Sequence, residues 1–173
     1  MKIILIGYMG SGKSVVGKAL AVQKQLPFLD LDEEISRREK KSIPEIFSDA
    51  GEIYFRRKEA EVLKELLEQE ANFVLSLGGG TPCYGKNLEL IKNAAHTHTV
   101  FLKTGLEELT ARLIKERENR PLIQEFDTPA LLNDFIRKHL FERNYYYNQS
   151  DLSLVTDDKS VPQLVTEIEN YLN

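Results

Sequence analysis

Residues 3–14 read IILIGYMGSGKS, in which four aliphatic residues run directly into a glycine-rich turn that ends in lysine and serine. Uninterrupted aliphatic residues are typical of a strand that is buried on both faces. The last eight residues match the pattern G-x-x-x-x-G-K-[ST] at every required position, and in this pattern the loop N–H groups and the N-terminus of the next helix bind phosphate. We therefore predict a strand, a phosphate-binding loop (P-loop) and a helix, in that order.

The P-loop pattern gives individual residues a role. Lys13 reaches the β and γ phosphates of a nucleotide, and the Ser14 hydroxyl ligates the Mg²⁺ that bridges them. The alternative is a glycine-rich turn that binds nothing, but the strand before it and the helix after it favour phosphate binding. The predicted nucleotide-binding residues are Gly10, Ser11, Gly12, Lys13, Ser14 and Val15.

Composition limits the class of protein and of partner. The 173 residues fit one compact domain. The net charge is −4 and charges of both signs are mixed, so no basic stripe exists for nucleic acid or an anionic membrane. The single cysteine, Cys83, cannot form an internal disulfide, the N-terminus lacks a signal-peptide pattern, and no apolar run has the roughly 18 residues of a membrane span. We expect a cytoplasmic monomer with a small-molecule substrate.

Strand and helix patterns alternate along the chain. After the first strand and helix, strand patterns recur at 27–30, 73–77, 99–102 and 151–155. Helical patterns separate them, and residues 33–70 are helical in pieces, with a helix start at Ser42 and a break at Gly51. Five strands that alternate with helices predict a three-layer α/β/α domain with a parallel sheet.

Two carboxylates stand where the second strand ends. Asp30 and Asp32 are two residues apart, and the carboxyl edge of a parallel sheet is where ligands of open α/β folds bind. A polar strand end followed by a helix N-cap is the alternative interpretation. The strand at 73–77 ends without Asp or Glu, so the common acidic partner of a P-loop is missing there. Asp30 is therefore the better candidate for the magnesium shell.

A glycine run and a pair of arginines indicate a second binding region. Gly78, Gly79 and Gly80 follow a predicted core strand directly, where they let a ligand approach the backbone. Arg56 and Arg57 precede Glu59 and Glu61, so each arginine can make a surface pair on one helix, an interpretation that fits Arg57 better than Arg56. Phe47 and Phe55 are expected in the core or as walls of a small pocket.

The C-terminal half contains a basic segment between two helices. The helix that starts near Leu106 is expected to end in a basic segment that contains Arg112, Lys115, Arg117 and Arg120. We predict that this segment is a mobile lid over phosphates. A solvated charged helix end is the alternative. Farther along, the tyrosines at 145–147 are expected as packing or rim residues.

Together these motifs resemble the shikimate kinase family, over nearly the whole chain. The resemblance is carried by GYMGSGKS (7–14), FLDLD (28–32), FRR (55–57), LSLGGG (75–80), RPLI (120–123) and ERN (142–144) with a tyrosine shortly after. It implies a single P-loop kinase domain over 1–173 with the sheet order 2-3-1-4-5, a shikimate-binding subregion at about 31–60 and a lid at about 112–127. Two departures are Val15, where the family commonly has threonine, and residues 145–148, which replace the usual Pro-Leu-Tyr.

The resemblance also implies an activity and residue roles. The family transfers the γ-phosphoryl group of ATP to the 3-hydroxyl of shikimate, giving shikimate 3-phosphate and ADP, in the biosynthesis of chorismate and aromatic amino acids. Lys13, Asp32 and Arg120 would be catalytic, and Asp30 would order a magnesium-bound water. The implied shikimate-binding residues are Asp32, Arg56, Gly78, Gly79, Gly80 and Arg143.

Other functions stay open on the sequence alone. A gluconate kinase or a nucleoside-monophosphate kinase would use the same P-loop without needing both Arg56 and Arg143. A nucleotide-binding module without catalysis is a further alternative, although the chain has no N-K-x-D guanine signature. Whether Asp32 is a general base or an orienting group is also open, because phosphoryl transfer depends chiefly on positioning and charge neutralisation.

Overall fold

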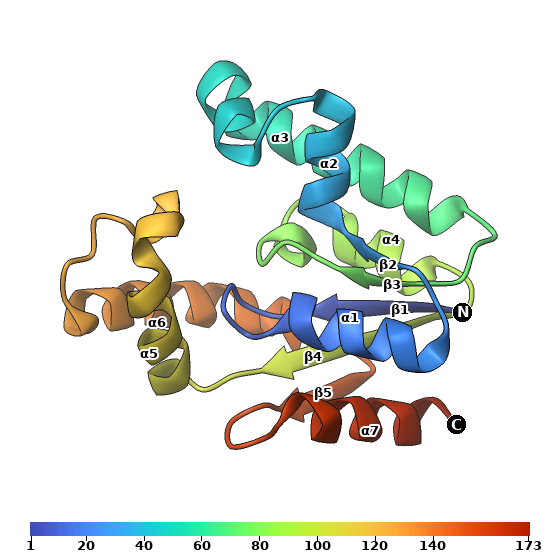
Figure 1. The fold of residues 1–173 in the computed structure, drawn as a ribbon. Helices are drawn as coiled ribbons and strands as arrows, with labels where there is room; N and C mark the ends of the chain where they lie inside the picture. The colour runs from blue at the N-terminus through green and yellow to red at the C-terminus, as the bar shows by residue number, and fades with distance from the viewer.

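A computed structural model describes residues 1–173, except for the side chains of Asn119 and Pro121. Five parallel strands form one sheet in the order β2-β3-β1-β4-β5 (Figure 1). The strands are β1 (Lys2–Ile6), β2 (Phe28–Asp30), β3 (Phe73–Ser76), β4 (Thr97–Lys103) and β5 (Leu152–Val155). The fold class and the strand order implied by the family resemblance are confirmed.

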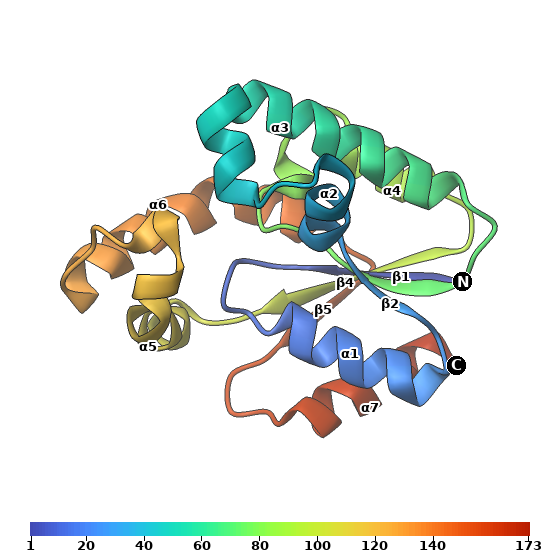
Figure 2. The same cartoon turned by 45° about the horizontal axis from the view of Figure 1, so that its top comes forward.

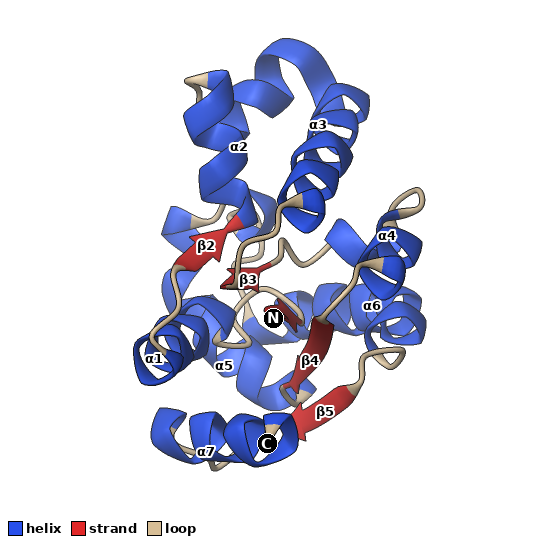
Figure 3. Ribbon diagram, turned by 90° about the vertical axis from the view of Figure 1, so that its right-hand side faces the viewer, coloured by secondary structure: helices blue, strands red, loops and turns tan.

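Helices cover both faces of the sheet. The α-helices are α1 (Lys13–Lys24), α2 (Leu31–Glu39), α3 (Ile43–Glu68), α4 (Asn87–Asn93), α5 (Leu106–Glu116), α6 (Pro129–Tyr147) and α7 (Val161–Leu172). Figure 2 shows α1 and α7 on one face of the sheet and α3, α4 and α6 on the other, and Figure 3 shows the single layer of strands between them. None of the helices described is both long and apolar enough to cross a membrane.

The alternation of side chains along β1 explains why its sequence is aliphatic from Ile3 to Ile6. Ile3 and Leu5 pack with α1 and α7 in one cluster, while Ile4 and Ile6 pack in the opposite cluster with α3, α5 and α6. All four side chains are fully buried. A central strand with helices on both faces favours apolar side chains along its length, and the one polar side chain of β1, Lys2, donates to a backbone carbonyl of α3 at 2.7 Å. The P-loop therefore starts from a strand that is buried along its whole length.

Helix boundaries follow local chemistry. Ser42 and Glu45 form the capping box that starts α3, and Gly51 interrupts this helix with φ 81° and ψ 173°, as predicted. Helix α2 starts at Leu31, earlier than predicted, because the Asp30 side chain accepts hydrogen bonds from the next backbone N–H groups. Asp32 consequently lies in the first turn of α2. Helix α5 continues past Arg112 to Glu116, where the sequence suggested that it would dissolve.

Candidate active site

The P-loop curls around the amino group of its own lysine. The Lys13 Nζ donates to the carbonyl oxygens of Gly7 and Tyr8, at 2.9 Å each, and the side chain is buried. Gly10 and Gly12 have φ values of 78° and 90°, in the left-handed region that favours glycine. Burial lowers the pKa of Lys13 to about 8, against the attraction of nearby carboxylates. The lysine therefore still carries its charge at neutral pH.

The two predicted magnesium-site residues lie beside each other. Asp30 Oδ2 is 3.3 Å from the Ser14 hydroxyl, which donates to it. The other carboxylate oxygen of Asp30 accepts the N–H of Asp32 at 3.1 Å, so the N-cap interpretation also holds for this residue. Among the described residues, no cluster of three His, Cys, Asp or Glu side chains can hold a metal. A hydroxyl beside a carboxylate fits Mg²⁺, which retains several waters and takes its other ligands from substrate phosphates.

Asp32 is the most perturbed carboxylate of the site. Burial and the neighbouring charges of Asp30 and Glu59 raise its pKa to about 6, although Lys13 and Arg56 pull in the opposite direction. At neutral pH the carboxylate is ionised, and its affinity for a proton is much higher than that of a free aspartate. A group with these properties can accept a hydrogen bond, or a proton, from a bound hydroxyl.

Arg56 is held by a buried carboxylate that the sequence interpretation had placed on the surface. Glu59 is 1% exposed, and its oxygens accept from Arg56 Nη1 at 2.9 and 3.1 Å and from the Thr81 hydroxyl at 2.7 Å. The Arg56 guanidinium also lies 3.8 Å from the centre of the Tyr84 ring. The Arg56–Glu59 pair is therefore not a surface pair, because Glu59 points inward, where Thr81 supplies a second donor. This agrees with the sequence interpretation, which favoured a surface pair for Arg57 over one for Arg56.

The surface pair with Glu61 that the sequence favoured for Arg57 is not found among the described residues. Arg57 lies over the ring of Tyr54, and in the described part of the chain its expected partner Glu61 pairs instead with Lys58, at 3.0 Å. Phe55 is buried against Phe47, with ring centres 4.6 Å apart, so both are core residues beside the arginine pocket.

The glycine run is required for space rather than for an unusual backbone. A Cβ at Gly78 would lie 3.2 Å from Asp32 Oδ1, and one at Gly80 would lie 3.1 Å from Arg56 Nη2. A Cβ at Gly79 would lie 3.6 Å from Arg143 Nη1, and none of the three glycines has a φ in the left-handed region. The run thus lies against the carboxylate and the two arginines. A Cβ at Gly78 or Gly80 would press against one of them, whereas a Cβ at Gly79 would make an ordinary van der Waals contact.

One cleft brings most of the predicted residues together. It has a volume of about 410 Å³ and runs from the P-loop to the end of β3. Its lining includes Gly10, Gly12, Lys13, Ser14, Val15, Asp30, Asp32, Gly78, Gly79, Arg112 and Arg120. The predicted residues Ser11, Arg56, Gly80 and Arg143 lie outside this lining. Ser11 is buried, and Arg56 and Arg143 lie against the glycine run.

The two arginines at the other end of the cleft are held by neighbouring groups. Arg112 donates to Glu108 at 2.8 Å and to the carbonyl of Gly10 at 3.1 Å, so it ties α5 to the P-loop. Arg120 donates two hydrogen bonds to Glu116, at 2.9 and 2.5 Å. Sequence reasoning placed Arg120 over the phosphates but did not identify the carboxylate one helical turn before it as its partner.

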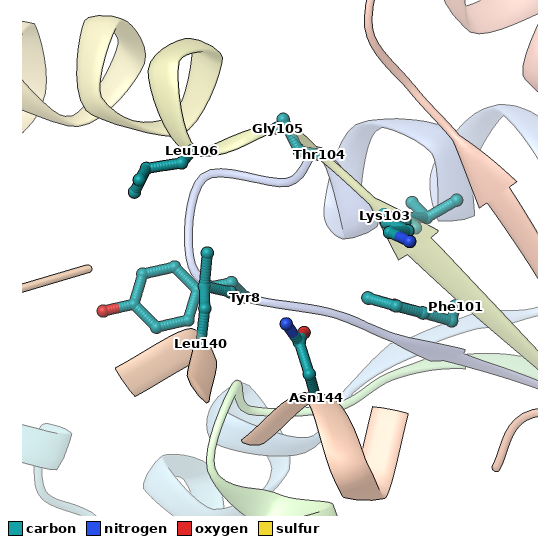
Figure 4. Close-up of a pocket in the computed structure, with 9 residues that line it drawn as sticks. Tyr8, Phe101, Lys103, Thr104, Gly105, Leu106, Leu140 and Asn144 are labelled. Carbon is teal, nitrogen blue, oxygen red and sulfur yellow. The ribbon is translucent and has the colours of Figure 1, made fainter. Parts of the chain in front are cut away.

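A smaller cavity of about 180 Å³ lies beside the P-loop, between the end of β4 and α6 (Figure 4). Tyr8 and Phe101 form its aromatic walls, and the Asn144 side chain extends from α6 into the space between them. The Tyr8 hydroxyl lies 2.9 Å from His139 Nδ1. No carboxylate lines this cavity, so among the described residues the acid and base groups gather in the larger cleft.

A parallel sheet with a P-loop, two carboxylates and a small-molecule cleft at its carboxyl edge defines a P-loop kinase of small molecules. Comparison with known proteins gives the family. The family model described as shikimate kinase matches residues 9–173. The chain belongs to the shikimate kinase family.

Individual relatives agree over nearly the full length. The chain is 42% identical to the shikimate kinase of Flavobacterium psychrophilum, covering 99% of this chain and 98% of that protein. The crystal structure of shikimate kinase from Bacteroides thetaiotaomicron has a TM-score of 0.90 at 34% identity, covering 99% and 98% of the two chains. Shikimate kinase from Acinetobacter baumannii in complex with shikimate has a TM-score of 0.87 at 33% identity, covering 99% and 92%.

Proposed function

We propose that this protein transfers the γ-phosphoryl group of ATP to the 3-hydroxyl of shikimate, producing shikimate 3-phosphate and ADP for chorismate and aromatic amino-acid biosynthesis. One observation carries the choice of acceptor. Arg56, Arg143 and the Asp32 carboxylate all lie against the glycine run. A pair of fixed guanidinium groups suits a carboxylate, and a nearby carboxylate suits hydroxyls, so the arrangement fits a polyhydroxylated acid.

The acceptor is positioned from two sides. Arg56 and Arg143 bind the shikimate carboxylate, and Gly78, Gly79 and Gly80 offer backbone N–H groups at close range. Asp32 accepts a hydrogen bond from the attacking hydroxyl, and its raised pKa suits a group that takes up the proton during transfer. The other substrate, ATP, places its phosphates on the N–H groups of the P-loop, which faces the same cleft.

Charge on the transferring phosphoryl group is neutralised by cations of the chain. Lys13 exchanges the carbonyls of Gly7 and Tyr8 for the β and γ phosphates, and Arg120 leaves Glu116 to reach the same group. Ser14, and Asp30 through a water molecule, are the residues that would hold Mg²⁺, which supplies further positive charge at the phosphates. The Ser14 to Asp30 hydrogen bond supports this pairing.

We further propose that residues 1–173 act as a single P-loop kinase domain, as a monomer in the cytoplasm. Its shikimate-binding subregion would span about 31–60 and its lid about 112–127. The 3-10 turns at 117–119 and 121–123 support a lid that moves as a separate piece, because they interrupt the helical backbone between α5 and α6.

ADP release from MgATP tests the proposal directly. Shikimate, gluconate and nucleoside monophosphates are compared as acceptors, and we expect turnover with shikimate alone. Arg143→Ala is the diagnostic variant, and we expect it to weaken shikimate binding by about 2–5 kcal/mol while ATP affinity changes little. Preferred turnover of gluconate or a nucleoside monophosphate would assign the protein to that activity instead. Equal loss of ATP and shikimate binding would remove Arg143 from the acceptor site.

A further inference from the structure

Three consecutive tyrosines end α6, and they have different surroundings. Tyr145 is 72% exposed, whereas Tyr147 is fully buried with its ring against Phe101, at 5.1 Å between ring centres. The Tyr147 hydroxyl donates to the backbone carbonyl of Gly79 at 2.5 Å. This short hydrogen bond joins residues 68 positions apart, so it ties the C-terminal turn of α6 to the glycine run after β3.

Tyr147 also stands beside one of the proposed substrate arginines. Arg143 lies four residues earlier on α6, and residues at this spacing share a helix face. Its Nη1 is 3.6 Å from where a Cβ of Gly79 would be. Burial raises the pKa of Tyr147, and Arg143 opposes only part of that rise. The hydroxyl therefore keeps its proton and remains a donor over the working pH range of an enzyme.

The position of the Gly79 carbonyl fixes more than one atom. In a trans peptide unit the C=O and the next N–H point in opposite directions, so holding the Gly79 carbonyl also sets the direction of the Gly80 N–H. No described residue accepts a hydrogen bond from the N–H of Gly79 or Gly80. Three glycines in a row have the largest backbone freedom that a chain offers and no side chain of their own to restrict it. The Gly78 and Gly80 carbonyls accept hydrogen bonds from the N–H groups of Thr81 and Cys83, at 3.0 and 2.9 Å, whereas the Gly79 carbonyl is held by Tyr147 from a neighbouring element.

We propose that the Tyr147 hydroxyl is a positioning group of the acceptor site, which holds the Gly79 carbonyl so that the N–H of Gly80 stays directed at bound shikimate beside Arg143. Tyr147 itself does not contact the substrate. The inference rests on the proposed function, because it assumes that the glycine run binds shikimate. It separates Tyr147 from Tyr145 and Tyr146, which the sequence alone did not distinguish.

Tyr147→Phe tests the hydroxyl while it keeps the ring that packs on Phe101, and Tyr145→Phe is the matched control at an exposed hydroxyl. Shikimate and MgATP affinities, steady-state constants and thermal midpoints are measured for the native enzyme and both variants. For Tyr147→Phe we expect shikimate affinity to fall by about three- to tenfold, the effect of one neutral hydrogen bond, with MgATP affinity unchanged. Tyr145→Phe is expected to match the native enzyme.

Each other outcome contradicts a defined part of the argument. Native shikimate affinity in Tyr147→Phe would overturn the positioning role and leave the proposed function intact. An equal loss of both substrates together with a lowered midpoint would show that the hydroxyl only stabilises the fold. A native enzyme that does not phosphorylate shikimate would overturn the proposed function, and with it this inference.

Discussion

Replacing Glu59 with alanine should destabilise the protein more than any change at the neighbouring charged positions of α3. The side chain is 1% exposed and holds both the Arg56 guanidinium and the Thr81 hydroxyl. Glu59→Ala removes the buried partner of the arginine and leaves it only the half-exposed Glu52, 3.4 Å from its Nε. Because Arg56 is then less restricted in its rotamer, the KM for shikimate should also rise.

The magnitude follows from the burial of the two partners. Removing one member of a fully buried ion pair costs about 3–5 kcal/mol. The Arg56 side chain is 21% exposed and also pairs with Glu52, so water and Glu52 partly stabilise the remaining charge and we expect the lower limit, about 3 kcal/mol. In a chain of this length 1 kcal/mol corresponds to about 2–4 °C in the unfolding midpoint, so the midpoint should fall by about 6–12 °C.

Thermal unfolding followed by circular dichroism measures this effect, with Glu61→Ala as the control. Glu61 lies on the same helix and pairs with Lys58 at 3.0 Å, but its side chain is half exposed. Exposed pairs contribute little to stability, so the control midpoint should stay close to native. If Glu59→Ala unfolds within about 2 °C of the native protein, the pair does not stabilise the fold as argued.

Three further predictions concern Asp32 and Arg120. Turnover should fall as pH drops through about 6, the pKa of Asp32, and a profile that stays flat from pH 7 to 5 would contradict this. The raised folded-state pKa makes the ionised Asp32 a cost to stability that grows as pH rises from the unfolded value of 3.8 to about 6. Urea unfolding should therefore find Asp32→Asn more stable than native above pH 6, with the difference vanishing near pH 4. Arg120→Ala should lower kcat by on the order of 10³-fold, with little rescue by lysine, while equilibrium shikimate affinity stays within a few fold. Steady-state kinetics with kcat within about tenfold of native would mean that this arginine does not act on the phosphoryl group.

Much of the fold follows from residue pattern alone. The aliphatic run before the P-loop, the Ser42 start of α3 and the break at Gly51 all depend on interactions between residues close in sequence. Such interactions are visible in the order of residue types. The strand order does not follow from residue pattern, because it depends on which strands pair across the sheet. It was implied by the family resemblance instead.

The site was predictable in part. Residues within one motif, such as Lys13 and Ser14, were found because their spacing is fixed by the loop that they build. The inward position of Glu59 was missed, since a glutamate three residues after an arginine has the same pattern on a surface and in a core. The partner of Tyr147 was missed because it is 68 residues away. The available signal was the single tyrosine that the family pattern shares.

The hydrogen bonds from Lys13 to the carbonyls of Gly7 and Tyr8 have a consequence for selectivity among anions. Two of the three N–H donors of the Lys13 ammonium group are used by loop carbonyls, so a phosphate that takes more than the third donor has to displace a carbonyl oxygen. The free energy of nucleotide binding is then the difference between the contacts of Lys13 with the phosphates and its contacts with the loop carbonyls. A chain of three phosphates that also engages the loop N–H groups can exceed that threshold, whereas free inorganic phosphate offers fewer contacts. We therefore expect the loop to favour the nucleotide over inorganic phosphate.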